Sequence, residues 1–351
     1  MVDPDPDIAS VLQQRGYCLR LRMALGTVAI LAGSPDAGMA AITLGQTVGT
    51  ANFLSYSRGQ ESRADQAAAT YLESVGSSGA GLVSFFKQLR NQQVITFNKP
   101  NQYYQTHPLA ASRMSALENR VSQSPHYDLR DSEEEIARLR MIQAKIHGFM
   151  QPAQVTLRQY PLSDLSAPAR YARSVAYYRS SNLPQALKEI DGLLAEQPEN
   201  AFFFELKGQM LFEHGKIVES VAPHRRSTEL APQYALLKIN HARALVALEQ
   251  PAATEEAIDI LKLALNMEKE NIFGWTELAR AYSASERDDL AALATAEAYY
   301  SAGVAHEAHR FATRAQRLLP QQTPEWRQAA DIVQATADDA QKFRRQNPGG
   351  Q

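Results

Sequence analysis

The sequence predicts an all-α protein whose second half is built from repeated helical hairpins. Long windows are rich in Ala, Leu, Glu, Gln and Arg, and Pro and Gly are sparse within them. No sustained alternation of β-branched and polar residues marks a strand. Pro198 and Pro232 lie 34 residues apart, the period of tetratricopeptide repeats. With 351 residues, 44% of them hydrophobic, the chain can form about two cores.

Charge and cysteine content limit the classes of function. Lys and Arg number 36 against 38 Asp and Glu, so the net charge of -2 gives no global positive field for nucleic acid, which we exclude as a partner. Cys18 is the only cysteine, so neither an intramolecular disulfide nor a CxxC metal site can form.

The first elements are expected to be two apolar helices within residues 23–54. Their Gly and Thr content and their length argue against a membrane span and favour a buried or membrane-touching hairpin, with peripheral membrane contact through this segment. The start, Met1-Val-Asp-Pro-Asp-Pro-Asp, lacks the basic residues and apolar run of a secretory signal. Helical spacing then predicts helices over 58–72, 82–89 and 110–121, with a polar loop over 94–105.

A bridging helix and a linker are expected in the middle of the chain. Acidic residues open the segment 132–149 and basic residues follow, the charge order that a helix dipole favours. Residues 152–168, with their prolines, indicate an extended linker. The predicted domains are therefore 1–125, a bridge and linker over 126–165, and a repeat domain over 166–351.

Small and bulky residues recur at corresponding places in the repeat domain. Each unit predicts a helical hairpin in which small residues allow close packing. We expect four or five hairpins and a capping helix from Pro324, with a concave face that binds protein partners. Small residues are expected at the helix contacts at Ala186, Gly208, Gly215, Ser220, Ala242, Ala257, Ala264, Ala279, Ala296, Gly303, Ala308, Ala312 and Ala315.

Two short segments in the first half resemble a known enzyme family. Residues 57–65 read SRGQESRAD and residues 106–113 read THPLAASR. They are similar, in order and spacing, to the SRxxExxAD and THPxxxxR segments of the zinc metallopeptidase family that includes the CAAX prenyl proteases. Fusion to tetratricopeptide repeats also fits this family. The resemblance implies a partial zincin-type metallopeptidase domain with zinc as its cofactor.

The resemblance assigns roles to three residues. Glu61 and Asp65, four residues apart, share one face of a helix. By the resemblance Glu61 is the third protein ligand of zinc. Asp65, by the same resemblance, supports a zinc-bound histidine without itself contacting the metal. The alternative is a solvated acidic face beside neighbouring arginines. His107 belongs to a loop near the metal by resemblance, or is a loop histidine that caps the next helix.

The HExxH motif, which supplies two zinc ligands and the general base in this family, is absent from the 351 residues. Residues 8–15, where chain order would place it, contain no ligand. The nearest pattern, His306-Glu307-Ala308-His309, is one residue short. We therefore expect no catalytic residue in this chain, weak or no zinc binding, and no metal-dependent proteolysis.

The resemblance implies a periplasmic protein of outer-membrane protein quality control, with unfolded or misassembled outer-membrane proteins and their assembly machinery as partners. The missing motif has two explanations: a truncated gene model, with the motif and a signal peptide encoded upstream, or a non-catalytic repeat adaptor. A cytosolic repeat scaffold without peptidase ancestry is a third reading.

Overall fold

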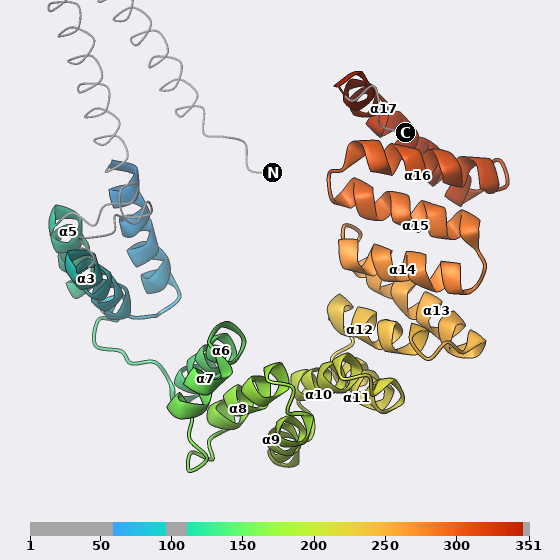
Figure 1. Cartoon of the computed structure of the whole chain (residues 1–351). Coiled ribbons are helices and arrows are strands. Elements are labelled where there is room, and N and C mark those ends of the chain that lie inside the picture. Colours follow the sequence, from blue (N-terminus) through green and yellow to red (C-terminus); the bar gives the residue numbers. More distant parts are fainter. Residues whose placement is uncertain (1–58, 96–110, 347–351) are drawn as a thin grey trace, which may run out of the picture. The chain divides into compact units, whose positions relative to one another are not determined.

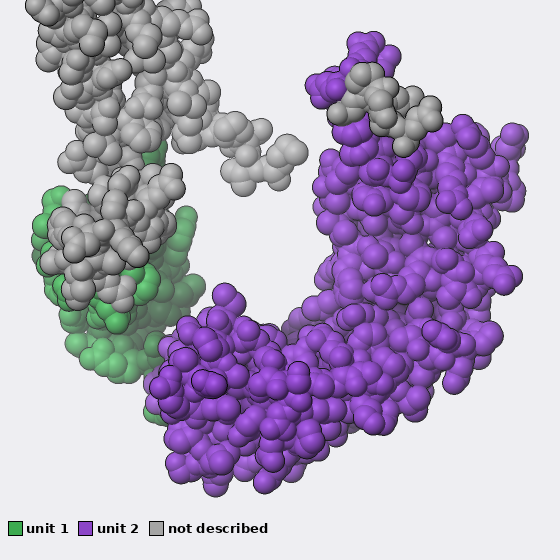
Figure 2. All heavy atoms as spheres, in the orientation of Figure 1, with its two compact units in different colours: residues 1–134 green, residues 135–351 purple. Residues whose placement is uncertain are grey.

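The computed structural model describes residues 59–95 and 111–346, and every regular element in these residues is an α-helix (Figure 1). The all-α prediction is therefore confirmed. The chain divides into two compact units, residues 1–134 and 135–351, which Figure 2 colours separately. The expected hairpin in 23–54, His107 and residues 8–15 lie outside the described residues. None of the described helices is both long and apolar enough to cross a bilayer.

Three helices make up the described part of unit 1: a helix over 59–74, α3 (Ala80–Ile95) and α5 (Ala111–Ser122). They share a small core of Ala69, Val83, Leu117 and Val121. Gly79 directly precedes α3 and lies close to α5. A Cβ on Gly79 would lie 2.8 Å from a methyl group of Val121. This close approach packs the start of α3 against α5.

The next helices are α6 (Glu133–Met150) and α7 (Ala153–Gln159), which together precede the hairpins. The bridging helix is found within one residue of its predicted limits. The extended linker is wrong for residues 153–159, which are helical. Buried Thr156 donates to the carbonyl oxygen of His147 over 3.0 Å and so fixes α7 on the end of α6.

A buried arginine joins this segment to the first hairpin. Arg173 on α8 (Ala167–Arg179) is 1% exposed; it donates to the carbonyls of Pro161 and Asp164 and pairs with Glu189 at 2.9 Å. A buried guanidinium is tolerated only when its donors are satisfied. The loop before α8 is therefore part of the hairpin's packing. The domain limits drawn at residues 125 and 165 stay a prediction.

Helices α8 to α17 form successive antiparallel hairpins (Figure 1). Most of the small residues expected at the helix contacts are buried, but Gly215 and Gly303 are exposed and Ala279 is half-buried. Gly215 and Gly303 adopt φ of 74° and 72° at the hairpin turns, a conformation that glycine reaches without strain. After α8 the helices are α9 (Leu183–Glu196), α10 (Ala201–Glu213), α11 (Ile217–Leu230), α12 (Ala235–Val246), α13 (Pro251–Met267), α14 (Ile272–Ala284), α15 (Asp288–Ser301), α16 (Ala305–Leu318) and α17 (Pro324–Gln346).

The terminal helix α17 packs on α16 and completes a hairpin with it. Ala329 and Ile332 of α17 join Ala308, Ala312 and Ala315 of α16 in one core cluster. The capping role expected of α17 stays a prediction.

Candidate functional site

The candidate site of unit 1 is a buried ion-pair cluster of Glu61, Asp65 and Arg113. Glu61 and Asp65 lie four residues apart on the 59–74 helix, and Arg113 belongs to the first turn of α5. Arg113 Nε and Nη2 donate to the two Asp65 oxygens, both over 2.8 Å. Arg113 Nη2 also lies 3.2 Å from Glu61 Oε2. The two carboxylates therefore converge on one guanidinium, as their helical spacing predicts.

Burial and charge make this cluster rigid. Asp65 and Arg113 are 6% and 7% exposed, and the Glu61 side chain is 22% exposed. Burial opposes the charged form of Arg113, but the hydrogen bonds and negative charges of Asp65 and Glu61 outweigh it and raise the pKa of the guanidinium. A bidentate arginine–carboxylate pair also fixes the relative orientation of the two helices.

Arg113 is the residue to which the motif alone assigned no role. It ends the THPLAASR segment, and Asp65 ends the SRGQESRAD segment. A fully buried arginine requires carboxylate partners, but 48 residues separate Arg113 from Asp65 and only the fold shows the pairing. The two segments that carry the resemblance therefore meet physically through Arg113.

The described residues supply one potential zinc ligand at this site, the Glu61 carboxylate. Catalytic zinc is held by three protein ligands, and the described part of the chain contains no group of three His, Cys, Asp or Glu side chains placed to hold a metal. Glu61, Asp65 and Arg113 therefore do not make a zinc site on their own. The zinc-ligand role of Glu61 and the supporting role of Asp65 stay predictions.

The near-motif in the repeats serves packing. His306 stacks on Phe343 with ring centroids 3.8 Å apart, and His309 Nδ1 lies 3.3 Å from Thr336 Oγ1. The two rings thus contact different residues of α17.

Polar groups with unmet hydrogen-bonding capacity surround a cavity of about 190 Å³ between α10 and α12. Arg243 lies with its guanidinium carbon 4.4 Å from the Phe212 ring centroid, and its Nε lies 3.9 Å from Glu277 Oε1. Among the described residues, no acceptor takes a hydrogen bond from the buried Arg243 Nε. Burial raises the pKa of Glu277 against the opposing effect of Arg280 and Arg243.

Glu205 lines the same cavity and is also largely withdrawn from water. Asn240 Nδ2 donates to Glu205 Oε1 over 3.1 Å, yet burial still raises the pKa of Glu205. Gln209 completes the polar lining. The cavity therefore offers a guanidinium, two amides and a carboxylate to a ligand that enters between the two helices.

The first half of the chain is similar to a known peptidase family. Residues 8–121 match the family model described as Peptidase family M48, a family of zinc metallopeptidases. The resemblance read from residues 57–65 and 106–113 is therefore confirmed, and the chain combines a region similar to this family with an array of helical hairpins.

The particular relatives are proteins called Beta-barrel assembly-enhancing protease. The protein of Escherichia coli (strain K12) is 28% identical over 295 residues, which are 83% of this chain and 59% of the relative. That of Yersinia pestis is 27% identical over 299 residues, 83% and 60% of the two chains. This chain therefore spans about 60% of the length of these relatives.

Two solved structures of MamA align with part of the chain. One has a TM-score of 0.41 at 18% identity and covers 48% of this chain and 98% of its own. The other has a TM-score of 0.39 at 12% identity and covers 53% and 97%.

Proposed function

We propose that this chain is a metallopeptidase-family protein of outer-membrane protein quality control in the periplasm. We also propose that the 351 residues bind their protein substrates without cleaving them. The name of the relatives supports β-barrel proteins of the outer membrane as the partners. The absence of HExxH from the 351 residues supports the lack of cleavage, since no general base and no histidine pair is present for the zinc chemistry of the family.

The observation that carries the binding role is the cavity around Arg243. Its guanidinium has a buried donor with no acceptor in the described structure, and it lies beside an aromatic ring. Such a donor costs free energy unless a ligand or water accepts from it. An unfolded chain supplies carbonyl and carboxylate acceptors, so a bound segment would satisfy this group.

Proteolysis is tested with the purified chain, added zinc, and unfolded casein or an unfolded outer-membrane β-barrel protein. We expect no cleavage that a chelator suppresses, because Glu61 is the only family zinc ligand identified in the sequence. Cleavage that both a chelator and Glu61→Gln abolish would show that the chain is an active peptidase and would refute this part of the proposal.

Binding is tested by capture of the same unfolded barrel protein. Arg243→Ala should weaken capture about tenfold, because a hydrogen bond to a charged group contributes about 1.5 kcal/mol. Arg226→Ala is the matched control, since Arg226 is exposed on α11 and pairs within its own helix with Glu229 at 3.1 Å. Equal capture by the Arg243→Ala and Arg226→Ala variants would show that Arg243 does not contribute to binding.

A further inference from the structure

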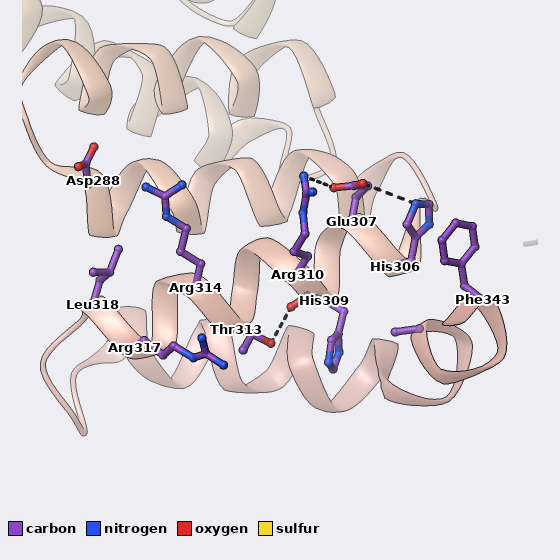
Figure 3. Close-up of a pocket in the computed structure, with 11 residues that line it drawn as sticks. Asp288, His306, Glu307, His309, Arg310, Thr313, Arg314, Arg317, Leu318 and Phe343 are labelled. Carbon is purple, nitrogen blue, oxygen red and sulfur yellow. Dashed lines mark hydrogen bonds and ion pairs between the residues drawn. The ribbon is translucent and has the colours of Figure 1, made fainter. Parts of the chain in front are cut away.

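A basic groove runs along α16, which packs on both α15 and α17 (Figure 3). We call it the α16 groove. Its volume is about 790 Å³, within the range of ligand-binding clefts. Helix α16 carries three arginines and one glutamate, whereas the preceding helix α15 carries three acidic residues and no basic one. The residues that define the groove are His306, His309, Arg310, Arg314, Arg317 and Phe343.

Two of the three arginines are available to a ligand. Arg310 pairs with Glu307 at 2.6 Å. Arg314 and Arg317 are exposed, and neither has an ion-pair partner within the described part of the chain. Arg314 projects from the helix into the hollow, beside Arg310 (Figure 3). The groove therefore holds positive charge that the fold itself does not neutralise.

The two ends of the groove are apolar and exposed. Leu318 is 49% exposed at one end, beside Asp288 (Figure 3). Phe343 is 41% exposed at the other, where His306 stacks on it. An exposed aromatic ring beside cationic groups is typical of the anchor positions of protein interfaces.

The two unpaired arginines can both reach an extended peptide. Arg314 and Arg317 are three residues apart on the helix, about 4.5 Å along its axis, and their long side chains can spread farther apart than that. In an extended chain, alternate side chains on one face repeat about every 6.6 Å. Acidic residues at alternate positions would thus each face one arginine, with an apolar residue reaching Phe343 or Leu318.

We propose that the α16 groove binds extended protein segments that carry acidic residues at alternate positions flanked by an apolar or aromatic residue. Peptide is favoured over nucleic acid because Asp288 and Glu307 also line the groove and would repel a continuous run of phosphates. The inference rests on the proposed function in taking a protein segment as the ligand, and it adds the chemistry of that segment.

The test uses the full chain and a fluorescently labelled peptide with three aspartates at alternate positions and a phenylalanine at each end. We expect saturable binding that weakens about tenfold with the pair Arg314→Gln and Arg317→Gln, since two exposed ion pairs to the peptide are then lost together. Added salt should weaken binding to the unmodified chain more than to this variant. A peptide with asparagine in place of aspartate should bind the unmodified chain no more tightly than the aspartate peptide binds the double variant.

The matched control removes the same charge elsewhere. Arg225 and Arg226 lie on α11, outside the groove, and are 50% and 45% exposed at their side chains. Arg225→Gln with Arg226→Gln should change binding less than about twofold. An equal loss of peptide affinity in both double variants would mean that net charge alone drives binding, and would overturn the proposal that the α16 groove is the binding site. Full competition by a single-stranded oligonucleotide of equal charge would overturn the peptide preference.

The outcome separates this inference from the proposed function. Capture of an unfolded barrel protein with no binding of the acidic peptide would overturn the groove assignment and leave the proposed function standing. Binding of the acidic peptide without capture of the barrel protein would support the groove and overturn the proposed function.

Discussion

At the scale of single residues, Arg113 links two helices of unit 1 through buried ion pairs. Its two hydrogen bonds to Asp65 and its approach to Glu61 connect α5 with the 59–74 helix. Asp65 is 6% exposed, so removal of the guanidinium would leave a carboxylate in a poorly hydrated position. The cost of an uncompensated buried charge exceeds that of a lost surface ion pair several-fold.

Arg113→Met should therefore destabilise unit 1 by about 3 kcal/mol. The measurement is hydrogen exchange of the amides in 59–74 and in α5, which should accelerate together. Lys87→Met is the control, because Lys87 pairs with Glu118 at 2.6 Å while both side chains are about half exposed, and that pair is worth about 1 kcal/mol or less. Adding Asp65→Leu to Arg113→Met should restore part of the protection. Indistinguishable exchange in the Arg113 and Lys87 variants would contradict this view of the cluster.

The sequence predicted Glu61 and Asp65 as partners from their spacing alone, because residues four apart on a helix always share a face. It could not predict that Arg113 binds both. That pairing depends on how α5 packs through Leu117 and Val121, and no local pattern records a contact across 48 residues.

At the scale of elements, the hairpins were predictable and the segment before them was not. The 34-residue spacing of Pro198 and Pro232 reflects a packing unit that repeats, so periodicity revealed it. Residues 152–168 have prolines and few apolar side chains, which favoured a linker. Their order comes from single polar contacts, the bonds of Thr156 and of Arg173, which have no periodic signature.

Close contact between α6 and α8 makes a sharp test of this docking. Gly148 of α6 is buried, and a Cβ there would lie 2.9 Å from the Cβ of Val175, which is 0% exposed. Gly148→Ala should lower the melting temperature of the chain, since overpacking of about 1–3 kcal/mol exceeds the gain of about 1 kcal/mol in helix propensity.

Gly192→Ala is the matched comparison on α9. A Cβ there would meet only the end of the Arg170 side chain, which can move away. The higher helix propensity of alanine then outweighs any steric cost, and Gly192→Ala should keep or raise the melting temperature. Melting temperatures that shift in the same direction in both variants would show that α6 does not pack tightly on α8.

At the scale of unit 2, apolar burial along the repeat array is uneven. One core cluster spans α8 to α10 and a larger one spans α12 to α15. Between them, the buried residues of α11 are Ser220, Pro223, His224 and Ser227, none of them a large aliphatic residue. Arrays of this kind are stabilised by contacts between neighbouring units, so the weakest interface sets where they open.

Protonation should open the array at this interface. His224 on α11 and His241 on α12 are both 3% exposed, and burial lowers the pKa of each to about 4, with nearby positive charge as a further cause. Since the folded pKa lies below the usual 6.5, the unfolded chain binds more protons between pH 6.5 and pH 4. Stability is therefore present above pH 6.5 and falls as the pH drops toward 4. Between pH 7 and pH 5 the loss is about 1–2 kcal/mol for each histidine.

Hydrogen exchange at pH 7 and pH 5, corrected for intrinsic rates, should show this loss in residues 217–246 before residues 257–282. His241→Leu is the test variant, because neither ring nitrogen of His241 has a hydrogen-bond partner among the described residues and an apolar side chain of similar size needs none. That variant should keep its protection at pH 7 and lose about half of the pH dependence, since only His224 then titrates. Loss of protection that is uniform from α8 to α17, or unchanged pH dependence in His241→Leu, would place the weak interface elsewhere.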